Sequence, residues 1–351
     1  MNIILIILVF GVIVFFHEFG HFIVAKLNHI AVMEFSIGMG PAIFSVQKKE
    51  TKYSLRLLPI GGFCMMMGED EESDDENAFN NRPIWARMLV IAAGPIFNFI
   101  LAFLFSIILI HYTGCDPATL YKVVENGPAE TAGIEPGDTV VAIDGSKIYN
   151  FRELQLYMAL DKDGSPVKLT MKKPSGETYK TTVTPALGSD GSYVIGVAGG
   201  NILADGFGTT IKYAALECRY WVKSTVLSLK LIVTGGVKSN DIMGPVGVGG
   251  AMNEILDEAK ESSPTTKDAI INVLLNMLNW CILLSVNLGI MNLLPIPALD
   301  GGRLLFLIIE AVRRKRIPQE KEAIVNLIGF ALLICLMVVV FFNDIKNVFF
   351  S

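Results

Sequence analysis

The sequence has few charged residues and no excess of basic ones. Only 18% of its 351 residues are charged, against about 25% in an ordinary soluble domain. Its 29 Lys and Arg residues face 34 Asp and Glu residues, of which seven lie in one acidic run at residues 69–76; outside that run, 27 acidic residues oppose 29 basic ones. A nucleic-acid-binding protein is not expected, because such proteins carry a basic surface.

Cysteine is also scarce. The chain has five cysteines, an odd number, with wide spacings and without a CxxC pair. This pattern predicts neither a disulfide framework nor a cysteine-based zinc site. The five positions are Cys64, Cys115, Cys218, Cys281 and Cys335.

Long apolar runs, in contrast, are abundant. A membrane span needs about 20 apolar residues, and four segments meet this need, at about residues 3–27, 88–110, 270–297 and 324–342. No Lys or Arg precedes the first run and no small-residue cleavage site follows it, so a cleaved signal peptide is not predicted. A transporter would show internal repeats between its halves, and the sequence shows none.

Lysine and arginine collect in two of the loops between these spans. Loops rich in basic residues stay in the cytoplasm, so we expect both loops to be cytoplasmic, both termini to be extracytoplasmic, and the long stretch 112–269 to lie outside. The residues are Lys48, Lys49, Lys52, Arg56 and Arg82 in the first loop, and Arg303, Arg313, Arg314, Lys315, Arg316 and Lys321 in the last.

The first apolar run contains an HExxH motif, formed by His17, Glu18 and His21. On a helix, residues four apart share one face, so both histidines can bind one metal ion while Glu18 acts as a base on a water molecule. Three ionisable groups within a membrane span are costly and indicate function rather than packing.

A catalytic zinc site needs a third protein ligand. His29 and His111 are the only other histidines, and the better candidate is Asp300, a lone carboxylate at the end of the third apolar stretch. Asp300 precedes a loop expected in the cytoplasm, and His17 lies about 21 Å along a helix that starts outside, so the two can meet at similar depth. The alternative interpretation is a plain Asp-Gly turn.

Three motifs together resemble the site-2 protease family, and more narrowly its bacterial regulator-of-sigma-E type. They are HEFGH at 17–21, GPIFN at 94–98 and NLLPIPALDGGR at 292–303. The resemblance implies an intramembrane zinc endopeptidase with His17, His21 and Asp300 as zinc ligands and Glu18 as catalytic base. It also implies substrate-binding roles for Asn287, Asn292, Pro295 and Pro297.

The same resemblance implies a location and a substrate class. The protein would lie in the bacterial cytoplasmic membrane, with its active site toward the cytoplasm. It would cut single-span membrane proteins, such as anti-sigma factors or signal-peptide remnants, after a prior extracytoplasmic cut. A sporulation-type relative that cuts a pro-protein is an alternative within the family. A membrane adaptor or inactive homologue is another, although no ligand or base is missing.

Residues 42–63 predict a β-hairpin around a turn at 48–51. Its edge could pair with an extended substrate by strand addition, or it could be an ordinary cytoplasmic hairpin. The residues leave the two about equal; the resemblance favours the first, since such proteases carry a membrane-associated β-loop here. The acidic run at 69–76 reads as a solvated loop without an assigned role.

The stretch 113–200 resembles a PDZ domain. Strands are predicted at residues 139–143, 167–171 and 178–183, and a helix at 151–160, with a tight turn at Asp144-Gly145. PDZ domains bind peptides by adding a strand to a sheet edge. Such a domain could bind a peptide or act as a gate or size filter for substrates, or it could be purely structural.

The stretch 201–269 predicts a helix at 209–233. Lys212, Arg219, Lys223 and Lys230 share one face, which suits an interfacial helix on the outer membrane surface or a solvated face. The sequence therefore predicts a polytopic α-helical membrane protein with an inserted α+β PDZ domain. Two catalytic membrane halves, 1–112 and 270–351, would flank the domain and the helical segment.

Overall fold

The computed structural model describes residues 2–69, 71, 73–160, 163–188, 191–235 and 244–350. The chain forms two compact units. One comprises Met1–Phe105 together with Thr225–Ser351, and the other comprises Ser106–Ser224.

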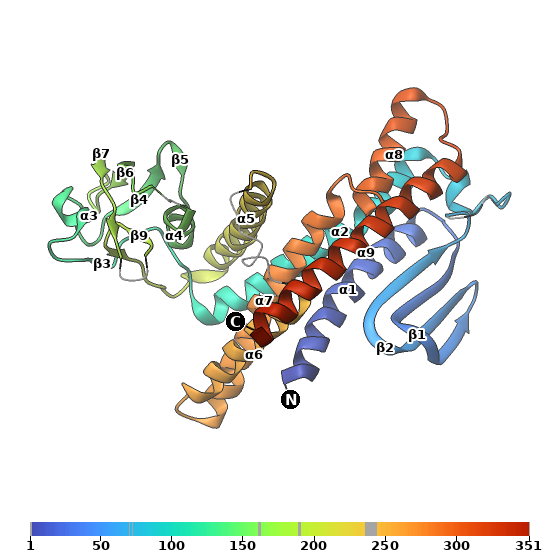
Figure 1. Ribbon diagram of the computed structural model, residues 1–351, viewed down its shortest axis with the longest axis horizontal. Helices are drawn as coiled ribbons and strands as arrows, with labels where there is room; N and C mark the ends of the chain where they lie inside the picture. Colours follow the sequence, from blue (N-terminus) through green and yellow to red (C-terminus); the bar gives the residue numbers. More distant parts are fainter. Residues whose placement is uncertain are drawn as a thin grey trace. The chain divides into compact units, whose positions relative to one another are not determined.

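Long apolar helices build the first unit. Four helices among the described residues are long and apolar enough to cross a membrane: α1 (Asn2–Leu27), α2 (Ile84–Thr113), α7 (Thr266–Leu293) and α9 (Gln319–Phe350). α1, α2 and α7 share one buried core, and both chain ends lie at the end of this bundle away from α8 (Asp300–Arg313) (Figure 1). Each helix coincides with a predicted apolar segment.

The third of these helices is shorter at its end than predicted. It stops at Leu293 instead of residue 297, and Leu294 already has extended backbone angles. Pro295 and Pro297 explain the stop, because proline has no N–H to donate and disfavours a helical residue before it. The six residues that follow Leu293 therefore connect α7 to α8. The helix α8 itself was not predicted from the sequence.

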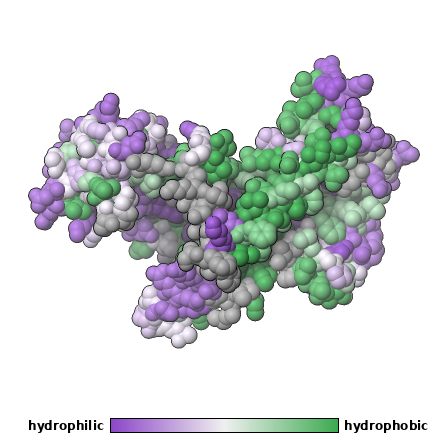
Figure 2. Space-filling view, viewed as in Figure 1, coloured by the Kyte–Doolittle hydropathy of each residue, from purple (hydrophilic) through white to green (hydrophobic). Residues whose placement is uncertain are grey.

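The outer surface of the bundle is apolar. Leu327, Leu332 and Val339 on α9 are each more than half exposed, and Figure 2 shows hydrophobic residues along this helix. A patch of this kind is unusual on a protein surrounded by water and marks a surface that contacts lipid or another protein.

A second helix missed by the sequence analysis, α6 (Pro245–Glu261), packs against the bundle. Its buried Met252 and Leu256 contact a core shared by α1, α2 and α7. The buried carboxylate of Asp344 on α9 accepts hydrogen bonds from the backbone N–H groups of Gly244, Val246 and Gly247, at 2.8–3.1 Å. One carboxylate thus satisfies three N–H groups that the start of a helix leaves without intrahelical partners.

The strands β1 (Val32–Lys48) and β2 (Thr51–Met66) each fold back on themselves. Residues 34–37 pair with residues 62–65 in the antiparallel sense. On their other side they pair with residues 52–55, and there the register is parallel. Residues 42–48 pair with residues 51–56 in the antiparallel sense. The result is a small sheet of four segments in the order 42–48, 51–56, 32–37, 62–66.

This sheet corrects the prediction of a simple hairpin at 42–63. The turn at 48–51 is present, but the inner segment 32–37 and the edge segment 62–66 were not predicted as parts of one sheet. Gly38, Gly40 and Gly61 have positive φ angles where the strands reverse, which glycine adopts without strain. Arg56 links segment 51–56 to segment 32–37 by donating hydrogen bonds to Ser36 Oγ at 2.9 Å and to Glu34 at 2.7 Å.

The second unit has its own core and a four-stranded sheet in the order β5-β4-β6-β7. The predicted strands and helix at 139–143, 178–183 and 151–160 agree with β4, β7 and α4. Asp144 and Gly145 both have positive φ angles, as a tight hairpin turn requires. The elements are β3 (Lys122–Val123), α3 (Pro128–Thr131), β4 (Thr139–Ile143), β5 (Ser146–Lys147), α4 (Phe151–Leu160), β6 (Val167–Lys172), β7 (Thr178–Val183), β8 (Ala186–Leu187), β9 (Tyr193–Val194) and β10 (Val197–Ala198).

The helix α5 (Gly206–Val233) begins close to its predicted start, but its basic face is partly used inside this unit. The fully buried Glu153 of α4 pairs with Arg219 and, at 3.5 Å, with Lys223. In the reverse sense, Arg152 pairs with Glu217 at 2.6 Å. Two of the four basic residues that were expected to face lipid headgroups or water therefore hold α5 against α4.

Candidate metal centre

The two histidines of the HExxH motif lie one turn apart on α1, and both are 7% exposed. Their Nε2 atoms are 3.3 Å apart, and the planes of their rings meet at 85°. The helix alone produces this arrangement, because residues four apart face the same side.

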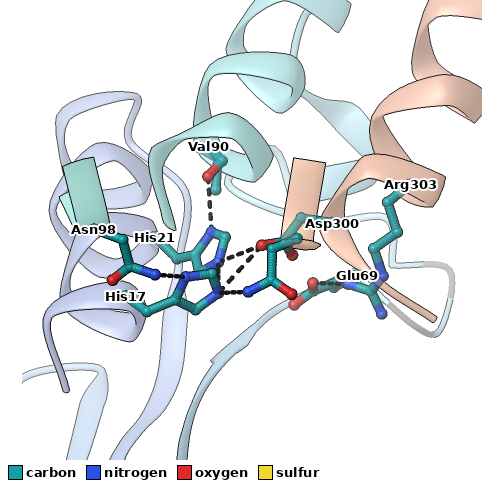
Figure 3. Close-up of polar contacts among 8 residues, drawn as sticks. His17, His21, Glu69, Val90, Asn98, Asp300 and Arg303 are labelled. Carbon is teal, nitrogen blue, oxygen red and sulfur yellow. Dashed lines mark hydrogen bonds and ion pairs between the residues drawn. The ribbon is translucent and has the colours of Figure 1, made fainter. Parts of the chain in front are cut away.

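Asp300 joins the pair from a distant part of the sequence (Figure 3). Its Oδ2 atom lies 3.2 Å from His17 Nε2 and 3.5 Å from His21 Nε2. Asp300 is the first residue of α8, so the alternative of a plain turn is wrong. Gly301 and Gly302 let α8 start here, since a Cβ on either would collide with backbone atoms of residues 293–294 and 296–297.

These three side chains fit a metal ion. One ligand atom from each lies within 4.8 Å of the others, and the buried Asp300 Oδ2 has no hydrogen-bond donor among the described residues. Two imidazole nitrogens and a carboxylate oxygen are donors that zinc prefers. Ligand atoms of a tetrahedral zinc site are about 3.3 Å apart, which agrees with the observed separations.

The outer nitrogens of both histidines are held by α2. His21 Nδ1 donates to the backbone carbonyl of Val90 at 2.8 Å, which leaves Nε2 with its lone pair for a metal. His17 Nδ1 lies 3.2 Å from the side-chain amide of the fully buried Asn98. The atom nearest to this nitrogen is Nδ2 of Asn98; a 180° flip of the amide would bring its oxygen to Nδ1, where it could accept the Nδ1 proton and free Nε2 in the same way.

Sequence reasoning did not assign a role to Asn98, although the GPIFN motif contains it. The same motif supplies Gly94, where a Cβ would lie less than 3 Å from ring atoms of both His17 and His21. A glycine at this position therefore leaves the space that the two imidazoles fill. Gly20 plays a matching part on α1, where a Cβ would collide with Ala93 and Phe97 of α2.

Glu18 and the metal-binding cluster line one cavity of about 350 Å³, called here the metal-site cavity. The second half of β2 forms one wall, and a Cβ on its Gly62 would be 3.4 Å from Cγ of Glu18. This wall is an edge segment of the four-segment sheet. The lining residues are His17, Glu18, His21, Phe63, Cys64, Met65, Met66, Glu69, Ile91, Asp300 and Arg303.

The profile of peptidase family M50 matches residues 5–336. The chain belongs to this family. It is therefore a zinc metalloprotease, which confirms the enzyme class and the cofactor expected from the sequence and sets aside the adaptor and the inactive homologue.

Named relatives extend over nearly the whole chain. A Clostridium acetobutylicum protein, provisionally named a zinc metalloprotease, is 38% identical over 98% of this chain and 97% of its own length. The zinc metalloprotease RasP of Bacillus licheniformis is 34% identical, and the regulator of sigma-W protease RasP of Bacillus subtilis is 32% identical; both comparisons cover 98% of each chain. In structure, the PDZ domain of an SdrC-like protein from Listeria innocua is 25% identical over 24% of this chain and 93% of that domain, with a TM-score of 0.22.

The four residues predicted to bind substrate are not all near the cluster. Asn292 is, because its amide nitrogen lies 3.4 Å from His17 Nε2. Asn287 instead accepts a hydrogen bond from Thr225 on α5. Pro297 packs against Gly329 of α9, and Pro295 is exposed.

Proposed function

We propose that the chain is an intramembrane protease whose zinc ion is held by His17, His21 and Asp300. The observation that carries this proposal is the convergence of these ligands, from α1 and from the start of α8, within a bundle of helices apolar enough to span a membrane. Water and charged groups cannot face lipid, and His17 and His21 are both buried within the protein.

Glu18 would be the catalytic base. A zinc ion in this cluster supplies the Lewis acidity that polarises the scissile carbonyl and acidifies water. Glu18 follows His17 directly and lines the same cavity. It would take one proton from the attacking water and pass it to the leaving amine, so that the water oxygen joins the carbonyl carbon as the C–N bond breaks.

The edge segment 62–66 would hold the substrate. A peptide bond within a helix is shielded by its own hydrogen bonds, so a membrane-spanning substrate must become extended before it is cut. Within the part of the chain that the structure describes, residues 62–65 pair with β1 on one side only, and residues 63–66 line the metal-site cavity. An extended substrate strand can pair with the other side. Of the predicted substrate-binding residues, Asn292 is the best placed to contact it near the metal-binding cluster. Asn287, Pro295 and Pro297 would contact the substrate farther from this cluster.

The substrates would be single-span proteins of the bacterial cytoplasmic membrane, such as anti-sigma factors or signal-peptide remnants, already cut outside. The name of the Bacillus subtilis relative, a regulator of sigma-W protease, supports the first class. We place both termini outside and the α8 end in the cytoplasm, because the basic loops lie at α8 and between α1 and α2. The two chain ends at one end of the bundle agree with this orientation (Figure 1).

Metal removal tests the proposal directly. The purified full chain, reconstituted in lipid vesicles with a tagged single-span substrate, should lose cleavage on treatment with a zinc chelator and regain it when zinc is added back. Gel separation of the two fragments measures the effect. Cleavage that persists in metal-free protein would rule out the mechanism, and cuts only in loops outside the bilayer would rule out intramembrane action.

We further propose that the 113–200 region is a PDZ domain that excludes substrates with large outer domains. A chain without residues 114–197 should then cut an untrimmed substrate that the full chain refuses, while cutting a trimmed substrate at the same rate. The two substrates, compared side by side with both proteins, measure this. Continued refusal of the untrimmed substrate by the shortened chain would contradict the gate and favour a structural role.

A further inference from the structure

A second and larger cavity shares four lining residues with the metal-site cavity, and two of the four form an ion pair. This α8–α9 cavity has a volume of about 800 Å³ and shares Glu69, Ile91, Asp300 and Arg303 with the metal-site cavity. Glu69 and Arg303 form an ion pair (Figure 3). The pair therefore stands at the boundary between the two spaces, next to a residue of the metal-binding cluster.

The α8–α9 cavity has a mixed lining, in which charged and amide side chains that can hold water and peptide groups lie beside apolar ones such as Phe79, Leu307 and Phe330. Arg87 pairs with Glu310 at 2.5 Å across it. Its other polar lining residues, apart from those shared with the metal-site cavity, are Asn80, Arg316, Glu322 and Asn326. A volume of about 300–1,000 Å³ with convergent polar groups is typical of ligand sites.

Glu69 reaches Arg303 from a fixed base. Met67 donates to the carbonyl of Ala31 at 2.9 Å and accepts from the N–H of Phe79 at 2.7 Å. At Gly68, with φ of +72°, a Cβ would collide with Asn80 and Ala78. Glu69, the first residue of the acidic run, therefore follows a backbone segment that these contacts hold in place. Its partner Arg303 lies one turn beyond Asp300 on α8.

We propose that the Glu69–Arg303 pair is a gate between the metal-site cavity and the α8–α9 cavity, and that the α8–α9 cavity receives the hydrophilic end of the cleaved peptide. The inference rests on the proposed proteolytic function. Water for hydrolysis and the released segment would pass when the pair separates. With 13% of the Glu69 side chain and 29% of the Arg303 side chain exposed, the pair is partly solvated, and ion pairs of this kind are opened at low cost. The gate assigns a role to Glu69, the first residue of the acidic run.

Cys64 reports on this gate, because it lines the metal-site cavity and carries a free thiol. Burial, with contributions from the charges of Glu18 and then Glu69, raises the pKa of this thiol, so that Cys64 in the closed protein should react slowly with maleimide. Mass spectrometry of the full chain in detergent can follow N-ethylmaleimide at Cys64. The buried Cys281 of α7 is the internal reference for loosening of the whole bundle.

Two variants separate gating from direct electrostatics on the thiol. Loss of the negative charge in Glu69→Gln favours the thiolate of Cys64, whereas loss of the positive charge in Arg303→Gln disfavours it. A gate predicts faster labelling in both, by about two- to fivefold, the change expected from loss of a partly exposed ion pair. Glu71→Gln, an exposed residue of the same run, is the matched control and should label at the wild-type rate.

The outcomes are distinct. Acceleration at Cys64 in both variants, without acceleration at Cys281, supports the gate. Opposite changes in the two variants, or equal effects of Glu71→Gln, would overturn it. If Cys281 also accelerates, the charge swap Glu69→Arg with Arg303→Glu decides, and failure to restore slow labelling overturns the gate. Labelling needs no catalysis, so a negative labelling result would leave the protease proposal untouched. A negative cleavage result would likewise leave the labelling result unchanged.

Discussion

Glu18→Gln should leave the protein folded and loaded with zinc, and should lower substrate cleavage by about 10²–10⁴-fold, the contribution of a positioned general base. The amide keeps the size of the carboxylate but cannot take a proton from water. Because Glu18 is not part of the His17, His21 and Asp300 cluster, zinc content should not change. Initial cleavage rates and zinc per chain, measured on the same preparation, test both halves of the expectation.

His17→Ala is the informative comparison for that variant. It removes one of the clustered side chains and should lose zinc as well as cleavage, whereas Glu18→Gln should lose only cleavage. Wild-type cleavage by Glu18→Gln would end the assignment of Glu18 as base. Loss of zinc from Glu18→Gln would instead show that the carboxylate belongs to the metal site.

Gly94→Ala should lower zinc affinity by about 10–100-fold, the size of effect found for residues that orient metal ligands. The added methyl group would stand within 3 Å of ring atoms of His17 and His21, and would push the two imidazoles away from Asp300. Alanine favours helix over glycine by about 1 kcal/mol, so a loss of affinity cannot come from helix propensity. Competition with a fluorescent chelator measures the change.

The control for Gly94→Ala lies on α6. Gly249→Ala adds the same methyl group at a site where, among the described residues, no atom outside the local helix backbone lies within 4 Å, and it should bind zinc with wild-type affinity. Equal zinc affinity of Gly94→Ala and Gly249→Ala would contradict the close fit of the imidazoles against α2.

Local sequence patterns were sufficient for the elements that depend on local forces. The apolar runs became four long helices, and residues 139–143, 151–160 and 178–183 became β4, α4 and β7 with the predicted bounds. The placement of His17 and His21 also follows from helix geometry alone. Asp300 was proposed from its position and from the family resemblance, since nothing local indicates a partner 279 residues away from His21.

The features that were missed depend on contacts between distant residues. The four-segment sheet forms because glycines reverse β1 and β2 and Arg56 ties the layers together, and alternation along one strand does not show which segments pair. Asn98 looks like any amide in an apolar helix until α2 packs on α1. The basic face of α5 looks free until the buried Glu153 is placed against it.

The zinc-ligand set is the central claim, and X-ray absorption at the zinc edge of the purified full chain tests it most directly. Cys64 lines the same cavity and would be the competing protein ligand. Zinc held by His17, His21 and Asp300 should show a coordination sphere of nitrogen and oxygen atoms at about 2.0–2.2 Å, without sulfur, that is disturbed in Asp300→Ala. A sulfur atom at about 2.3 Å, or a coordination sphere that Asp300→Ala leaves unchanged, would contradict this ligand set.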